Sequence, residues 1–123
     1  GAKFTHGYSF DKVEVFGIDF LSFLNIFQID YIDLIKIDIE GLEYKVIKSF
    51  LNLLKSRRIK EVIFEVNSPT LNSFGSTKQE LVGLWLDLDY DLFAIDLDGS
   101  THLLNEQFVI ENDFFDCLAK LKV

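Results

Sequence analysis

The stretch that decides the fold runs from Asp33 to Lys55 and reads "DLIKIDIEGLEYKVIKSFLNLLK". Its first part is apolar apart from one acid and one lysine, which predicts a strand over residues 32–37 covered on both faces of a sheet. Asp38 and Glu40 follow directly, and Gly41 then opens a helix with one apolar stripe. A strand, an acidic turn and an amphipathic helix in this order are typical of an α/β unit.

The segments on either side continue this alternation. Upstream, Val13–Phe16 predicts a short strand, and Asp19 is placed to cap a helix over residues 20–27. Downstream, the sequence predicts a strand over 60–66, a loop over 67–76, a helix over 77–88, a hairpin turning at Asp98-Gly99 and a C-terminal helix over 113–122. We therefore expect a doubly wound, mostly parallel sheet with helices on both faces and an antiparallel hairpin at its edge.

Length and composition predict one domain. The chain has 123 residues, of which 49% are apolar, and neither a repeat nor a linker interrupts it. Residues 1–11 have no period and are expected to form a loose arm before an α/β body over residues 12–123. The chain has no Met, even at position 1, so we expect it to be part of a longer protein.

Charge, hydropathy and cysteine content narrow the function classes. A net charge of −8 argues against a nucleic-acid partner, which needs clustered lysines and arginines. There is no apolar run of about eighteen residues, as a membrane span requires. The single Cys117 rules out an internal disulfide and fits a reducing compartment, so we expect a cytoplasmic protein.

Polar side chains follow two strands of the predicted sheet, where each strand ends. Asp38 and Glu40 come after the first, and Glu65 and Asn67 end the next. Ligands of open α/β sheets bind beyond the carboxyl ends of the strands, so we expect these four side chains to share one rim. Such oxygens suit Mg²⁺ or Ca²⁺, or accept a proton from a substrate hydroxyl. The alternative is structural: Glu40 complements the following helix, and Glu65 pairs with a lysine.

Other familiar sites are absent from the sequence. No His or Cys pair has zinc-ligand spacing, and Asp87, Asp89 and Asp91 lack the glycine that an EF-hand loop needs at its sixth position. The glycines form no loop of the kind that cradles a phosphate or a nucleotide.

The segment "KIDIEGLE", Lys36 to Glu43, resembles the K-I-D-v-E-G-x-E signature of FkbM-type methyltransferases, which transfer a methyl group from S-adenosylmethionine. The resemblance covers about Val13 to Glu106. Three further segments are similar to elements of the family, namely "VEVFGIDFLSFL" (13–24), "EVIFEVN" (61–67) and "ELVGLWLDLDYDLFAID" (80–96).

The resemblance implies a class I methyltransferase fold of the Rossmann type, of which this chain would form the C-terminal half. It implies S-adenosylmethionine as the cofactor, a role for Asp19 in cofactor binding, and a small-molecule or glycan hydroxyl as the methyl acceptor. Asp38 or Glu40 would act as the catalytic base, and Glu65 and Asn67 would line the acceptor pocket. The family's glycine-rich cofactor turn would lie upstream of this segment.

Two other hypotheses stand beside the methyltransferase. The chain could be a non-catalytic half-domain that dimerises or binds a partner, or an enzyme of another type that uses a divalent cation held at the rim. In a C-terminal half, the strand over 32–37 would be an open apolar edge. We expect another copy of the chain, the N-terminal arm or a missing N-terminal half to cover it.

Overall fold

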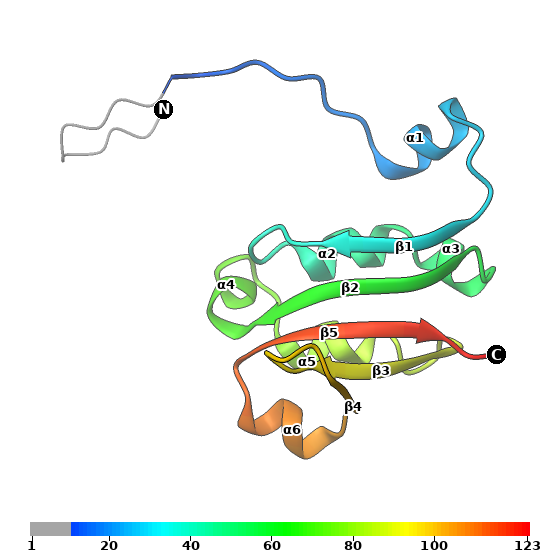
Figure 1. The fold of residues 1–123 in the computed structure, drawn as a ribbon. Coiled ribbons are helices and arrows are strands. Elements are labelled where there is room, and N and C mark those ends of the chain that lie inside the picture. The colour runs from blue at the N-terminus through cyan, green and yellow to red at the C-terminus, as the bar shows by residue number, and fades with distance from the viewer. Residues whose placement is uncertain (1–10) are drawn as a thin grey trace.

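The computed structural model describes residues 11–123, which form a mixed α/β unit (Figure 1). The helices are α1 (Phe20–Ile26), α2 (Glu43–Ser49), α3 (Leu51–Lys55), α4 (Ser68–Ser73), α5 (Lys78–Gly83) and α6 (Glu106–Glu111). The strands are β1 (Ile32–Ile37), β2 (Ile59–Asn67), β3 (Tyr90–Ile95), β4 (Thr101–Leu103) and β5 (Phe114–Leu121).

The strands form one sheet in the order β1-β2-β5-β3-β4. Only β1 and β2 pair in parallel, whereas β2–β5, β5–β3 and β3–β4 are antiparallel. The prediction of a mostly parallel sheet is therefore wrong for strand pairs, because β5 inserts between β2 and β3. Since β5 opposes both neighbours, β1, β2 and β3 still point the same way, and their carboxyl ends share one rim. The predicted hairpin is confirmed as β3 and β4, at the edge of the sheet.

The C-terminal helix predicted over residues 113–122 is also wrong, because this segment is β5. Phe115, Cys117 and Ala119 are buried, whereas Asp116 and Lys120 are exposed and Leu118 is half-buried. That alternation has the period of a strand, and residues 61–67 of β2 supply its hydrogen-bonding partner. The neighbouring strands therefore override a segment whose local sequence is compatible with a short helix.

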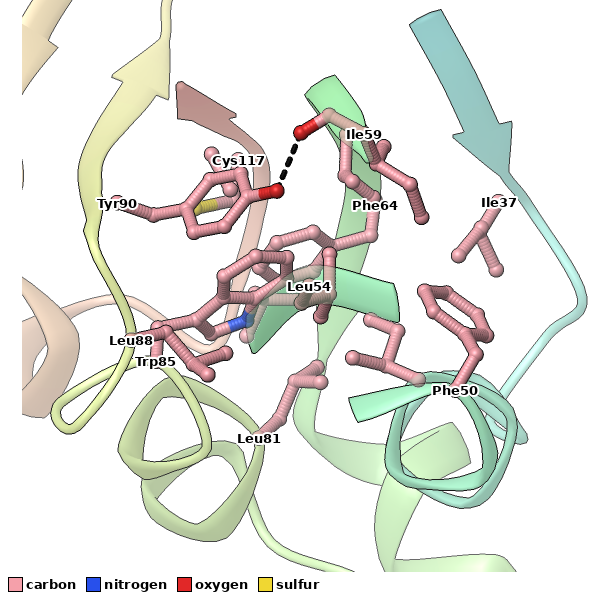
Figure 2. Close-up of a cluster of buried hydrophobic side chains, with 14 of the residues drawn as sticks. Ile37, Phe50, Leu54, Ile59, Phe64, Leu81, Trp85, Leu88, Tyr90 and Cys117 are labelled. Atoms are coloured by element: carbon pink, nitrogen blue, oxygen red, sulfur yellow. Dashed lines mark hydrogen bonds between the residues drawn. The ribbon is translucent and has the colours of Figure 1, made fainter. Parts of the chain in front are cut away.

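The core lies between one face of the sheet and helices α2, α3 and α5 (Figures 1 and 2). Phe64 of β2 and Trp85, which follows α5, are stacked with ring centroids 5.5 Å apart. Tyr90 is buried beside them, and its hydroxyl donates a hydrogen bond to the carbonyl of Ile59. Aromatic stacking and apolar burial thus fix the central strands against the helices.

The opposite face of the sheet is not covered by any helix of residues 11–123 (Figure 1). The strand register places Ile63, Leu118 and Phe93 in a row across this open face. In β1, Leu34 is 52% exposed on the same face. The doubly wound arrangement, which needs helices on both faces, is not confirmed.

Several elements differ from the sequence-based prediction. The segment Val13–Phe16 is not a strand, and no neighbouring strand pairs with it in the described chain. The helix expected after Gly41 is divided into α2 and α3 at Phe50. The loop predicted over residues 67–76 contains α4, which Asn67 caps and in which a proline occupies the first turn. The expected arm over residues 1–11 lies outside the described residues except for its last position.

Within residues 11–123, no helix combines the length and the apolar character needed to cross a bilayer.

Candidate functional site

A hollow of about 330 Å³ lies at the rim where β1 and β2 end. Residues of four strands line it: Lys36, Ile37, Asp38, Ile63, Phe64, Glu65, Ile95 and Asp116. The rim is where ligands of open α/β sheets bind, because polar groups from several strands converge there on one opening. Three of the lining residues are carboxylic acids and one is a lysine.

Asp38 and Glu65 reach this hollow together because their strands are in register. Ile37 pairs with Phe64, which places the next residue of each strand side by side. Both therefore lie at the carboxyl ends of parallel neighbours, as expected from the sequence. Their roles as catalytic base and acceptor ligand stay predictions.

Asp116 is a site residue that sequence reasoning missed. It lies in β5 directly opposite Glu65, and the same register puts Ile95 of β3 on its other side. The segment around Asp116 was predicted to be helical, so nothing suggested that it would join the rim. The local signal was weak, because only Asp116 and Lys120 interrupt an otherwise apolar run along 114–121.

The surroundings of Glu65 raise its pKa. Partial burial is the largest cause of a raised pKa at Glu65, and the negative charges of Asp38 and Asp116 raise this pKa further. A hydrogen bond from the Asn67 amide, 3.4 Å from Glu65 Oε1, opposes the increase. A carboxylate with a raised pKa is a stronger base than an ordinary one, which suits it to receive a proton.

The other predicted site residues lie outside the hollow. Glu40 is exposed on the turn after β1, at a φ of 52°. The Oδ1 of Asn67 caps α4 by accepting from the amide of Thr70 at 3.3 Å. Asp19 caps α1 and accepts from the amide and hydroxyl of Ser22, bonds that hold the pKa of Asp19 below its usual value. The functions predicted for these three residues stay predictions, and Asp38 is the stronger choice of base.

A second, more apolar hollow of about 240 Å³ adjoins the first and shares Ile95 and Asp116 with it. Its remaining lining comes from the β3–β4 turn, α6 and the start of β5, namely Asp96, Leu97, Phe108, Asn112, Phe114 and Phe115. An acidic opening therefore continues into an aromatic one along the rim.

The residues of the hollow fit some groups better than others. Within residues 11–123, no three His, Cys, Asp or Glu side chains are arranged to hold a metal ion. The carboxylates of Asp38, Glu65 and Asp116 complement a cation such as a sulfonium or an ammonium, and Lys36 complements a carboxylate. The hollow thus fits the methionine part of S-adenosylmethionine in charge, although the sequence has no glycine-rich loop for its nucleoside.

Comparison with known proteins identifies the family. No curated protein and no solved structure matches the chain. The family model for the methyltransferase FkbM domain matches residues 3–99, which is more than half of the chain. The matched segment includes β1, its acidic turn and the end of β2, and thus Asp38 and Glu65. The chain therefore belongs to the FkbM methyltransferase domain family.

Proposed function

We propose that this chain forms the acceptor side of an S-adenosylmethionine-dependent methyltransferase that methylates a hydroxyl group of a small molecule or glycan. The observation that carries the proposal is the meeting of Asp38, Glu65 and Asp116 at one hollow in a member of a methyltransferase family. A hydroxyl must lose its proton when its oxygen is methylated, and a carboxylate within hydrogen-bond reach can take that proton.

The chemistry divides between the cofactor and the residues of the chain. When bound, S-adenosylmethionine supplies an activated methyl group on a positively charged sulfur. Asp38 orients the acceptor hydroxyl and takes its proton. Glu65 accepts a second hydrogen bond from the acceptor or shares the proton, for which its raised pKa suits it. Holding the acceptor oxygen in line contributes much of the acceleration.

The adjoining apolar hollow supports the proposal that the acceptor also carries an apolar surface or a sugar ring. Phe108, Phe114 and Leu97 offer an apolar surface beyond Asp116, at the far side of the acidic opening. Aromatic side chains pack against sugar-ring faces as well as other apolar groups. The part of the acceptor that does not react would bind there.

Methyl transfer from labelled S-adenosylmethionine to a panel of hydroxylated small molecules and glycans tests the proposal. Because general-base catalysis contributes about 10²–10⁴-fold, Asp38→Asn should lower kcat by that order, and Glu65→Gln should have a smaller effect. Asp87→Asn is the matched control, since Asp87 is exposed and lies outside both hollows. The assay uses the whole methyltransferase domain, because the proposal gives this chain only the acceptor side. Equal rates for all three variants in that domain would contradict the proposal.

A second candidate function is a non-catalytic interaction module. It is favoured by the apolar side chains exposed before and along β1, of which Val15 is 84% exposed and Leu34 is 52% exposed. A second copy of the chain or the N-terminal half of a methyltransferase domain could cover them together with the free edge of β1. Light scattering over a range of protein concentrations separates these cases, because only self-association depends on concentration.

A further inference from the structure

The turn that joins β1 to α2 is held from inside by a buried carboxylate. Glu43 is the first residue of α2 and is only 1% exposed. Its Oε2 accepts a hydrogen bond from the amide of Gly41 at 2.8 Å, and its Oε1 accepts from the amide of Ile39 at 3.4 Å. No ion pair with Glu43 occurs within residues 11–123, so backbone amides compensate its burial.

The same turn contains two consecutive residues with a positive φ, of which the first is not a glycine. Glu40 has a φ of 52° and Gly41 a φ of 111°, the left-handed region that side chains disfavour. The turn also lies against α4: a Cβ added to Gly41 would be 2.3 Å from the carbonyl oxygen of Thr70. Such a turn persists only where its surroundings over-determine it. Here Glu43 supplies the hydrogen bonds and α4 closes off the space.

Asp38 is the residue on which this arrangement acts. It stands between Ile37, which is paired with Phe64, and Ile39, whose amide Glu43 holds. The backbone on both sides of Asp38 is therefore fixed, by the sheet on one side and by Glu43 on the other. Glu43 does not line the hollow itself.

We infer that Glu43 is a positioning residue, which sets the direction of the Asp38 side chain into the hollow by fixing the β1–α2 turn. The inference rests on the proposed function only in that Asp38 is taken to be the base; the effect of Glu43 on the turn does not depend on it. The alternative is that Glu43 merely complements the positive end of α2, as an acid in the first turn of a helix can. That role needs neither burial nor bonds to amides that precede the helix, and both are observed.

Amide hydrogen exchange measured by NMR separates the two roles without cofactor or acceptor. In the wild-type chain, the Gly41 amide should be protected nearly as well as the amides of the core strands. In Glu43→Gln, we expect its protection to fall about tenfold or more beyond the change in global stability, because a charge-assisted bond is lost. The amide signals of Asp38 and Glu65 should shift with it.

Two control variants define the comparison. Glu40→Gln also removes one negative charge from the turn, but it keeps both hydrogen bonds that Glu43 accepts. Lys78→Met perturbs a buried charge that makes no hydrogen bond to the turn, and should change exchange only in step with global stability. If Glu43→Gln does not fold, Glu43→Asp, which keeps the charge but lacks one methylene, should show the same local loss.

Two results would overturn the inference: rapid exchange of the Gly41 amide in the wild-type chain, or loss of protection in Glu43→Gln that only follows global unfolding. Neither depends on methyl transfer. Failure of the proposed function would instead appear as a well-protected turn together with equal rates of methyl transfer for the variants of the whole domain.

Discussion

Alternate residues of β2 share one backbone but have opposite surroundings. Val62, Phe64 and Val66 are fully buried under helices, whereas Ile63 and Glu65 between them are only partly covered on the open face. The side chains on one face of this strand pack in the core and stabilise the fold. On the other face, Glu65 helps to line the acidic hollow. Stability and the proposed chemistry are thus separated by a single residue step, because side chains of a strand alternate.

The largest difference in stability should come from truncating two neighbouring side chains that lie on opposite faces of β2. Phe64→Ala removes a buried ring stacked on Trp85 and should lower the free energy of unfolding by about 3–5 kcal/mol. Ile63→Ala removes a half-buried side chain and should cost about 1 kcal/mol. Urea denaturation followed by circular dichroism measures both. A similar loss of unfolding free energy in the two variants would show that both faces of β2 contribute equally to stability.

The turn beneath the hollow should be nearly as sensitive as the core. Gly41→Ala forces a methyl group towards the Thr70 carbonyl at a positive φ, and should cost about 2–3 kcal/mol. Gly75 also has a positive φ, of 78°, but a Cβ there would meet no atom. Gly75→Ala should therefore cost only about 1 kcal/mol, from conformation alone. Equal thermal shifts for the two variants would show that α4 does not press on the turn.

A buried charge on the helical side offers an intermediate test. The ammonium of Lys78 donates to the carbonyls of Ile110 and Asn112 and to Asp113, which joins α5 to the start of β5. Lys78→Met leaves these acceptors without a donor and should lower stability by about 1–3 kcal/mol. Lys55→Met, at an exposed position, should change it by about 0.5 kcal/mol or less. If Lys78→Met left stability unchanged, water would have replaced the ammonium as the hydrogen-bond donor to these acceptors.

The smallest effect should depend on pH. Because the folded-state pKa of Glu65 is raised above its usual 4.5, the folded chain binds the proton more tightly than the unfolded chain. Stability therefore falls as pH rises from the unfolded pKa through the folded one, and the penalty persists at higher pH. Glu65→Gln should be slightly more stable than the wild type at about pH 7, with no difference at about pH 4. If Glu65→Gln were instead less stable than the wild type at about pH 7, the ionised Glu65 side chain would stabilise the fold, contrary to this prediction.

The sequence predicted the elements whose signals are local. The strand over 32–37, the acidic turn and the Asp98-Gly99 hairpin depend on periodicity and turn chemistry, and all three occur. The capping box of α5, in which Thr77 and Glu80 exchange hydrogen bonds, is another local feature, since it depends on residues three positions apart.

What the sequence could not predict depends on distant neighbours. β5 becomes a strand because β2 and β3 leave a place between them, and only that pairing brings Asp116 to Glu65. The close approach of α4 to Gly41 likewise depends on a helix in a segment that was predicted to be a loop. The candidate site was therefore anticipated at Asp38 and Glu65 but not at its third acid or its supporting carboxylate.

We propose that the rim where β1 and β2 end binds the groups that take part in methyl transfer. The most direct measurement is an NMR titration of the chain with S-adenosylhomocysteine, following the backbone amides. We expect saturable shifts concentrated at Asp38, Glu65 and Asp116, and we expect Asp38→Asn to lose them. Shifts confined to the opposite end of the sheet, around Ile59 and Lys120, or no saturable shifts at all, would contradict it.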